Sequence, residues 1–212
     1  MSEQLSNEAI TEQASASVAD SGDIRSRVRN LTLSAIKQRH LEATEVREII
    51  KAMVGGINLG LEKREADSKA AMTEAFSGMD EALQKSAEAT HLALQELAED
   101  EKSFSENELA TALDNLKETE KDFLAAINEV ATLAGDRIKA DWSELVEHAR
   151  RTGTDTGRQV ADTVDTFSNR VGGAAKDAGR VGGAAARQLS ARFVQVASGI
   201  LAGITDALHE KK

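Results

Sequence analysis

The sequence has no proline and no cysteine, and few of its 212 residues are aromatic. Proline breaks helix interiors and marks loops, so its absence indicates long helices joined by few shaped loops. The absence of cysteine excludes disulfides, thiolate metal sites and cysteine nucleophiles, and it fits a reducing cytoplasm. Aromatic residues make up 3% of the chain, with no tyrosine and a single tryptophan, Trp142. Because large rings are scarce, we expect thin apolar seams between helices rather than a thick globular core.

Signals for export or membrane insertion are also missing. Residues 1–20 are rich in Ser, Glu, Gln and Ala, without a basic start or an apolar core, so we expect a disordered arm rather than a signal peptide. The longest run without a charged residue, 193–205, has 13 residues, whereas a membrane-spanning helix needs about 20. The predicted location is therefore cytoplasmic, at most peripheral to a granule or membrane.

Charge is unevenly distributed along the chain. The formal net charge is −10; residues 65–149 carry 21 acidic and 7 basic residues, and residues 150–212 carry 6 acidic and 10 basic ones. An acidic centre and a basic tail indicate two partners of opposite charge, or contact of these parts with each other. Binding to duplex nucleic acid is not expected, because phosphate contacts need a strong cationic field.

The apolar spacing predicts an all-α fold. Steps of three and four residues place helices at about 23–62, 65–98, 104–150 and 155–209. We expect an elongated helical bundle or coiled coil with a long amphipathic C-terminal helix. Its parts would be a disordered N-terminal arm over 1–20, a bundle or coiled-coil body over 21–150, and an amphipathic helix over 151–212.

The third predicted helix carries a heptad pattern. Alternating steps of four and three connect Leu109, Leu113, Leu116, Glu120, Phe123, Ile127, Val130 and Ala134. All but Glu120 are apolar, and a period of about 3.5 residues is typical of left-handed coiled coils. We therefore predict a homo-oligomer whose seam consists of Leu109, Leu113, Leu116, Phe123, Ile127 and Val130.

The C-terminal region repeats every 11 residues instead. From Val160 to Leu208, apolar or small residues follow steps of 4, 3 and 4, which gives about 3.67 residues per turn, close to a relaxed helix. Basic residues outnumber the single acidic residue between positions 170 and 205. Basic amphipathic helices are typical of segments that lie in an interface. The candidate surface-binding residues are Arg170, Arg180, Arg187, Leu189, Arg192, Phe193, Ile200, Ile204 and Leu208.

Three interpretations of this tail remain open. Its small residues and positive charge suit docking on the acidic central helices of the same chain. Its apolar ends suit an external apolar or anionic surface, such as a polymer granule or a membrane. The Ala- and Gly-rich middle, 175–186, also allows disorder.

No catalytic residue, metal or cofactor is expected. The four histidines are isolated from one another, so no zinc-protease motif is present. Glu88 and His91 form one Glu-x-x-His, whereas di-iron bundles use two, so a solvated helix face is favoured over a helical metalloenzyme. Four Gly-xxx-Gly pairs also occur, and we interpret the first two as weak helices or hinges. The pairs are Gly56/Gly60, Gly153/Gly157, Gly179/Gly183 and Gly199/Gly203.

The Pro-free, Cys-free, Ala-rich chain resembles phasins, the proteins that coat polyhydroxyalkanoate granules in bacteria, over about residues 24–208. Residues 160–208, with Val-Gly-Gly-Ala-Ala at 171–175 and again at 181–185, are similar in style to synuclein- and perilipin-type lipid-surface helices. This resemblance implies amphipathic coating of an apolar surface, self-association and no catalysis. The alternative is an intracellular coiled-coil scaffold or adaptor that oligomerises through residues 104–150.

Overall fold

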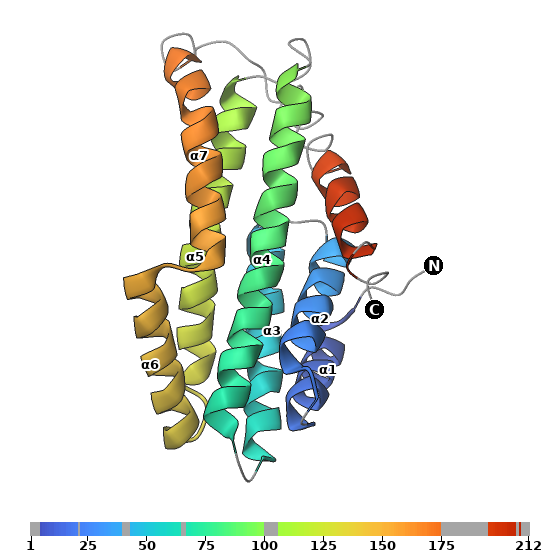
Figure 1. Cartoon of the computed structure of the whole chain (residues 1–212), viewed down its shortest axis with the longest axis vertical. Coiled ribbons are helices and arrows are strands. Elements are labelled where there is room, and N and C mark those ends of the chain that lie inside the picture. Colours follow the sequence, from blue (N-terminus) through green and yellow to red (C-terminus); the bar gives the residue numbers. More distant parts are fainter. Residues whose placement is uncertain are drawn as a thin grey trace.

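A computed structural model describes residues 5–20, 22–39, 43–64, 67–99, 106–174, 195–206 and 208. These residues form helices packed side by side, without a strand among them, so the predicted all-α bundle is confirmed (Figure 1). The helices are α1 (Asn7–Ala19), α2 (Ile24–Arg39), α3 (Ala43–Glu62), α4 (Ser68–Glu99), α5 (Glu106–Ala131), α6 (Asp136–Thr152) and α7 (Asp155–Ala174). Residues 195–206 are also helical; together with Leu208 we call them the C-terminal segment.

Helices α4 and α5 run along most of the bundle, and the other helices cover them in two tiers (Figure 1). In the lower tier, α3 packs on α5, α2 packs on α4, and α1 lies across α3. Helix α6 lies beside the lower half of α5, and α7 lies beside its upper half. The bundle is therefore broad below and narrows above to α4, α5 and α7, with the C-terminal segment alongside.

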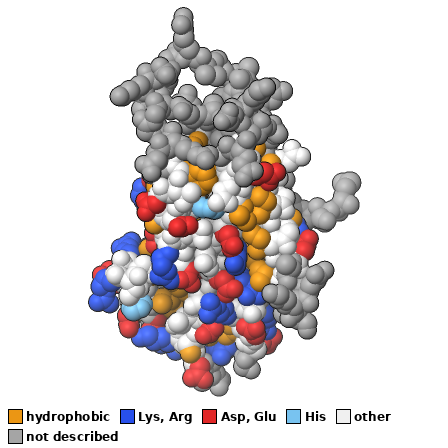
Figure 2. Space-filling view, turned by 45° about the horizontal axis from the view of Figure 1, so that its top comes forward, with side chains coloured by type: hydrophobic (Ala, Val, Ile, Leu, Met, Phe, Trp, Pro, Cys, Tyr) orange, Lys and Arg blue, Asp and Glu red, His pale blue; other side chains and the backbone are white. Residues whose placement is uncertain are grey.

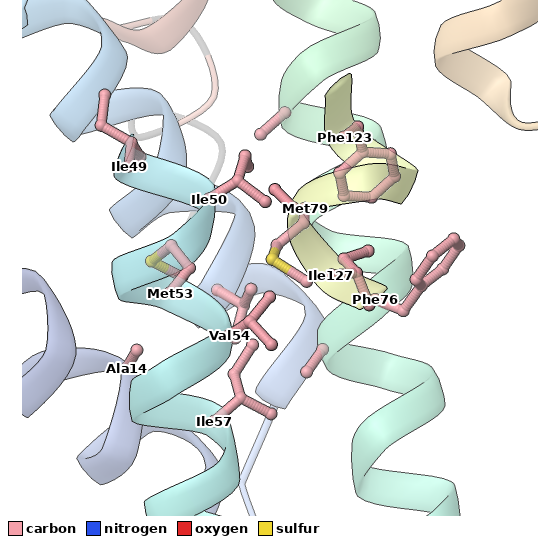
Figure 3. Packing of buried hydrophobic residues seen from close by; sticks show 14 of the residues in the cluster. Ala14, Ile49, Ile50, Met53, Val54, Ile57, Phe76, Met79, Phe123 and Ile127 are labelled. Carbon is pink, nitrogen blue, oxygen red and sulfur yellow. The ribbon is translucent and has the colours of Figure 1, made fainter. Parts of the chain in front are cut away.

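The main core lies in the lower tier, between α3, α4 and α5 (Figure 3). Side chains of α3 such as Ile50 and Ile57 point toward Met79 of α4 and Ile127 of α5. The rings of Phe76 and Phe123 meet with their centroids 5.3 Å apart. Each fully buried side chain of this size contributes about 1.5–3 kcal/mol, which lets a core with few rings hold the bundle together.

Trp142 attaches α6 to this core. Its side chain is 0% exposed, and its indole Nε1 donates a hydrogen bond of 2.8 Å to Asn58 Oδ1 on α3. A buried indole N–H without a partner would cost about 1–3 kcal/mol, so this pair fixes the position of α6. It also makes the single tryptophan a sensitive reporter of folding.

The prediction of a disordered arm over residues 1–20 is wrong for residues 7–19, which form α1. Ser6 caps this helix by accepting the Ala9 N–H. Ile10, Ala14 and Val18 are spaced by four residues and are 0% exposed. The polar composition conceals this short apolar stripe, and α3 supplies the surface that covers it.

Helix α1 approaches α3 at Gly56 and Gly60. A Cβ at Gly56 would overlap the Thr11 carbonyl oxygen, and one at Gly60 would lie 2.6 Å from the Ser15 carbonyl oxygen. This glycine pair, which we interpreted as a weak helix or hinge, therefore permits close packing of two helices. The same spacing has this role between helices in membranes.

Two arginines hold the ends of α1. The Arg39 guanidinium donates to Asn7 Oδ1 at 2.7 Å and to the Leu5 carbonyl. Arg64 Nη1 donates to the Val18 carbonyl at 2.8 Å, in the last turn of α1. Helix ends leave backbone groups unpaired, and a cation at the C-terminal end also matches the helix dipole.

The predicted helix over 104–150 is divided into α5 and α6, which turn back on each other around Gly135. This break coincides with the point where the heptad steps change to four, at Ala134 and Ile138. The prediction of one helix over 23–62 is also wrong, since α2 and α3 are separate helices. In both cases the apolar periodicity of the sequence continues across the position where the chain changes direction.

The predicted single helix over 155–209 is described in two stretches, and residues 175–194 between them lie outside the described residues. Helix α7 packs on α4 and α5, whereas the C-terminal segment lies beside α2 (Figure 1). Helix α7 is therefore part of the bundle, and the expected boundary between body and tail at residue 150 falls inside α6. The 11-residue repeat predicts an apolar stripe on each stretch, but it does not require both stretches to meet one surface.

Replacing Gly56 by alanine is expected to destabilise the protein, whereas the same change at Gly55 is expected to stabilise it. A Cβ at Gly55 meets no atom within 4 Å, in contrast to Gly56. Overpacking should lower the free energy of unfolding by about 1–3 kcal/mol, and alanine at an open helix position should raise it by about 1 kcal/mol. Urea unfolding followed by Trp142 fluorescence measures both changes. Equal stability of the two variants would show that α1 does not pack closely on α3.

Candidate functional site

The C-terminal segment packs its apolar face onto the main core. Ala197 and Leu201 are 0% exposed, and Ile200, Ile204 and Leu208 are partly buried against the core cluster. Three of the candidate surface-binding residues, Ile200, Ile204 and Leu208, are thus engaged with the body of the same chain. Arg170 lies in α7. The remaining candidates lie outside the described residues; they are Arg180, Arg187, Leu189, Arg192 and Phe193.

An ion pair joins this segment to the end of α2. Lys37 Nζ lies 3.1 Å from Asp206 Oδ1, and the two side chains are 37% and 70% exposed. Exposed pairs of this kind contribute about 0–1 kcal/mol, so apolar contact dominates the docking. The charge distribution of the sequence suggests basic residues of the tail paired with acidic residues of the body. In this pair the tail supplies the acidic residue and the body supplies the basic one.

The acidic centre instead pairs with basic residues of α2 and α3. Glu81 of α4 lies 2.9 Å from Arg29 and 3.1 Å from Arg25. Glu129 of α5 contacts Arg47 and Lys51, and its pKa is held below its ordinary value by their hydrogen bonds, that from Lys51 being the strongest. Figure 2 shows acidic and basic side chains interspersed on one face, around a band of hydrophobic ones. Much of the charge asymmetry along the sequence is therefore balanced within the fold.

The predicted oligomer seam is buried within a single chain. Leu109 and Leu113 pack with Leu94 and Phe167, and Leu116 packs with Ala87 and Val160. Phe123 and Ile127 belong to the main core, and Val130 packs against it. The heptad pattern of α5 thus serves contacts with α3, α4 and α7. Self-association through these residues would require the bundle to open.

Glu120, the charged member of that heptad on α5, has its carboxylate beside the first residues of α7. Thr154 caps α7 by accepting the Gly157 N–H at 2.8 Å, and its hydroxyl donates to Glu120 Oε1 at 2.6 Å. A Cβ at Gly157 would overlap the Glu120 carboxylate. Gly153, at φ 78°, ends α6 by donating its N–H to the Ala149 carbonyl. The Gly153/Gly157 pair therefore shapes a turn between two helices and makes room for a carboxylate.

Asp80 of α4 binds the same turn from the other side. Its carboxylate accepts the Asp155 N–H at 2.8 Å and the Thr156 N–H at 3.0 Å. The Thr156 hydroxyl donates to Asp80 Oδ1 at 2.7 Å. We call Asp80, Glu120 and residues 154–157 the α7 junction. It satisfies the backbone donors that begin α7, and it places negative charge at the positive end of that helix.

Burial dominates the titration of Asp80. The residue is 6% exposed, and loss of hydration raises its pKa above the ordinary value, even though the hydrogen bonds from Thr156 and Asp155 favour the charged form. Asn would replace it only in part, because its Oδ1 accepts hydrogen bonds whereas its Nδ2 is a donor that cannot accept a second backbone N–H. The sequence carries few signals of this junction, namely Glu120 in an apolar heptad and the run Thr-Gly-Thr-Asp-Thr-Gly at 152–157, and neither predicts the contact with Asp80.

The polar groups of the α7 junction have a structural role. Both Asp80 oxygens accept hydrogen bonds from α7, and Glu120 is bound by Thr154. The described residues contain no group of three or more His, Asp or Glu placed to hold a metal ion. Its groups are thus occupied in joining α4, α5 and α7.

Glu88 and His91 engage different partners. Glu88 pairs with Lys85 at 2.7 Å. His91 Nδ1 lies 3.1 Å from the buried hydroxyl of Thr163 on α7, and its ring meets Phe167 edge-on. The Thr163 hydroxyl also lies within hydrogen-bond distance of the Gln159 carbonyl on α7. His91 therefore helps to bind α7 to α4.

The fold and its polar junction define an all-α bundle protein with an internally docked C-terminal segment. None of the helices in the described ranges has the length and apolarity to cross a membrane. The chain belongs to a family described as a family of unknown function (DUF6781), whose model matches residues 1–210. No curated protein and no solved structure matches it.

The free energy of unfolding is expected to depend on pH through Asp80. Because folding raises the pKa of Asp80 above 3.8, the stability that this group contributes is complete below pH 3.8 and is lost as pH rises through the raised pKa. Relative to Asp80→Asn, which does not titrate, the wild type should lose stability as the pH rises from 3.8 through the raised pKa of Asp80. Urea unfolding at each pH measures the difference.

Asp114→Asn, whose side chain is 73% exposed, is the matched control for removal of one negative charge on the bundle. A stability difference between wild type and Asp80→Asn that stays constant with pH, or that grows as pH rises, would contradict the burial of Asp80.

Proposed function

We propose that this protein associates with an apolar or anionic surface in the cytoplasm, such as a polymer granule or a membrane, and that it does so without catalysis. The observation that supports this function most directly is the apolar face of the C-terminal segment. Ile200, Ile204 and Leu208 are only partly buried, although the main core of the bundle is largely inaccessible to solvent. These side chains retain apolar area that an external surface can cover.

Charge supports the same function. Residues 150–212 carry 10 basic and 6 acidic residues within a chain of net charge −10. The basic residues that precede the C-terminal segment are Arg170, Lys176, Arg180, Arg187 and Arg192. Each basic residue near an anionic membrane contributes about 1 kcal/mol. The tail is therefore the part of the chain suited to an anionic surface.

The bundle offers a body that stays folded while its tail is engaged elsewhere. Trp142, Phe123 and Met79 are buried by α3 to α6, and Leu201 is the fully buried member of the main cluster that comes from the C-terminal segment. Transfer of Leu201 and its neighbours to an external surface would exchange one apolar environment for another. Burial contributes about 1.5–3 kcal/mol for each large side chain, whichever apolar surface covers it. The free energies of the two states are therefore close.

A scaffold or adaptor that oligomerises through residues 104–150 is the second candidate. Its seam residues, including Leu116 and Ile127, are buried inside one chain, so this route competes with folding of the bundle.

Reversing the charge of Arg180, Arg187 and Arg192 to Glu is expected to weaken sedimentation with phosphatidylglycerol vesicles by about 100-fold or more, since the loss of each positive charge alone costs about 1 kcal/mol. The control Arg150→Glu/Arg151→Glu changes two exposed basic residues at the end of α6 and should retain most of the binding.

Replacing Leu189 and Phe193 by Ser tests the apolar part on polyhydroxyalkanoate particles. The control is Leu133→Ser, which changes a side chain that is 84% exposed in the turn between α5 and α6. The first variant should lose binding and the control should keep it. If wild-type protein sediments with neither vesicles nor polymer particles, the proposed function is wrong.

The thermal midpoint of the wild type is expected to stay constant over a wide range of protein concentration, because the α5 seam packs within the chain. Oligomers joined through their cores gain stability as concentration rises. Leu116→Asp should lower the free energy of unfolding by about 3–5 kcal/mol without changing the molar mass of the folded fraction in light scattering. A midpoint that rises with concentration would support the scaffold instead.

A further inference from the structure

The apolar side chains of the C-terminal segment that pack on the body are the ones that we propose to contact an external surface. Leu201 and Ala197 are fully buried on the body, beside the partly buried Ile200, Ile204 and Leu208. On the outer side, Gly199 and Gly203 are exposed, and a Cβ at either meets nothing within 4 Å. One helix face cannot cover the core and an external surface at once. We therefore propose that the docked segment is a closed state that withholds the protein's surface-binding face; this inference rests on the proposed surface binding.

The closed state is held weakly. The described residues of the segment are helical, and most of the stability of a helix in a protein comes from packing of its apolar face. Within it, Ser198 Oγ is buried without a hydrogen-bond partner, which opposes docking. Gly199 and Gly203 each weaken the helix relative to alanine. The segment thus remains docked through one narrow apolar face and can be displaced by another surface.

The Lys37–Asp206 ion pair gives an anionic surface a means to open this state. Among the described residues, Lys37 and Asp206 form the ion pair that joins the segment to the body. Near an anionic surface, Lys37 is attracted to the surface and Asp206 is repelled, so both partners favour separation. Salt also weakens the pair, because both side chains are partly exposed. An anionic apolar surface therefore releases the segment and provides its next contact.

The natural chain has no cysteine, so a reversible bridge can test the closed state. In Lys37→Cys/Asp206→Cys, a short bis-methanethiosulfonate linker joins α2 to the segment, and dithiothreitol removes it. The bridged protein is expected to bind phosphatidylglycerol vesicles at least tenfold more weakly than the same protein after reduction. Trp142 fluorescence checks that both forms are folded.

The matched control places the bridge within the body. Lys69 and Glu144 form a pair between α4 and α6 at 2.7 Å, with side chains 59% and 68% exposed. Bridging Lys69→Cys/Glu144→Cys leaves the segment unrestrained, so vesicle binding should be the same before and after reduction. A loss of binding here would show that any bridge impairs binding, and the inference would fail.

Lys37→Gln separates release from simple charge attraction. Removing a positive charge should weaken binding to anionic vesicles equally in Lys37→Gln and in the control Lys69→Gln if charge alone matters, whereas opening the closed state should make Lys37→Gln bind about two- to fivefold more tightly than that control, the range for an exposed ion pair. Equal binding by the bridged and reduced segment, or binding by Lys37→Gln no tighter than by Lys69→Gln, overturns the inference while leaving the proposed function intact. If the reduced protein and the wild type do not bind at all, the proposed function is wrong and the inference falls with it.

Discussion

The upper half of the bundle depends on the hydrogen bonds that Asp80 accepts at the start of α7. A helix start carries backbone N–H groups that need acceptors, and here Asp80 and Thr154 supply them. Because Asp80 belongs to α4 and Glu120 to α5, these bonds place α7 against both helices at once. Helix α6 then covers the lower half of α5 and α7 the upper half (Figure 1). Burial of the Asp80 carboxylate opposes this arrangement, and its hydrogen bonds offset part of that penalty.

Packing elsewhere follows from the shortage of large side chains. With 3% aromatic residues, the chain fills space by bringing backbones together, as at Gly56 and Gly60. Polar side chains hold the ends of α1: Ser6 caps its start, and Arg39 and Arg64 bind its two ends. Narrow apolar seams and polar contacts at helix ends thus act together throughout the lower tier.

The proposed function uses a difference between two kinds of burial. In the body, side chains such as Ile127 and Trp142 are enclosed on all sides. In the C-terminal segment, Ile200 and Ile204 are only partly buried, and an exposed ion pair joins this segment to α2. A surface that offers apolar area and negative charge can replace those contacts at little net change in free energy. The rigid body and the exchangeable tail would then have separate roles in one chain.

The sequence by itself determined the all-α class, the apolar faces of α4 and α5, and the amphipathic character of the tail, because these depend on local spacing. The α7 junction, the contact of α1 with α3 and the docking of Ile200 and Ile204 were decided only by the tertiary structure. Asp80 and Thr156 lie 76 residues apart, and no periodicity relates such distant positions. For the same reason, the heptad of Leu109 to Val130 could predict a seam without showing that its partners are helices of the same chain.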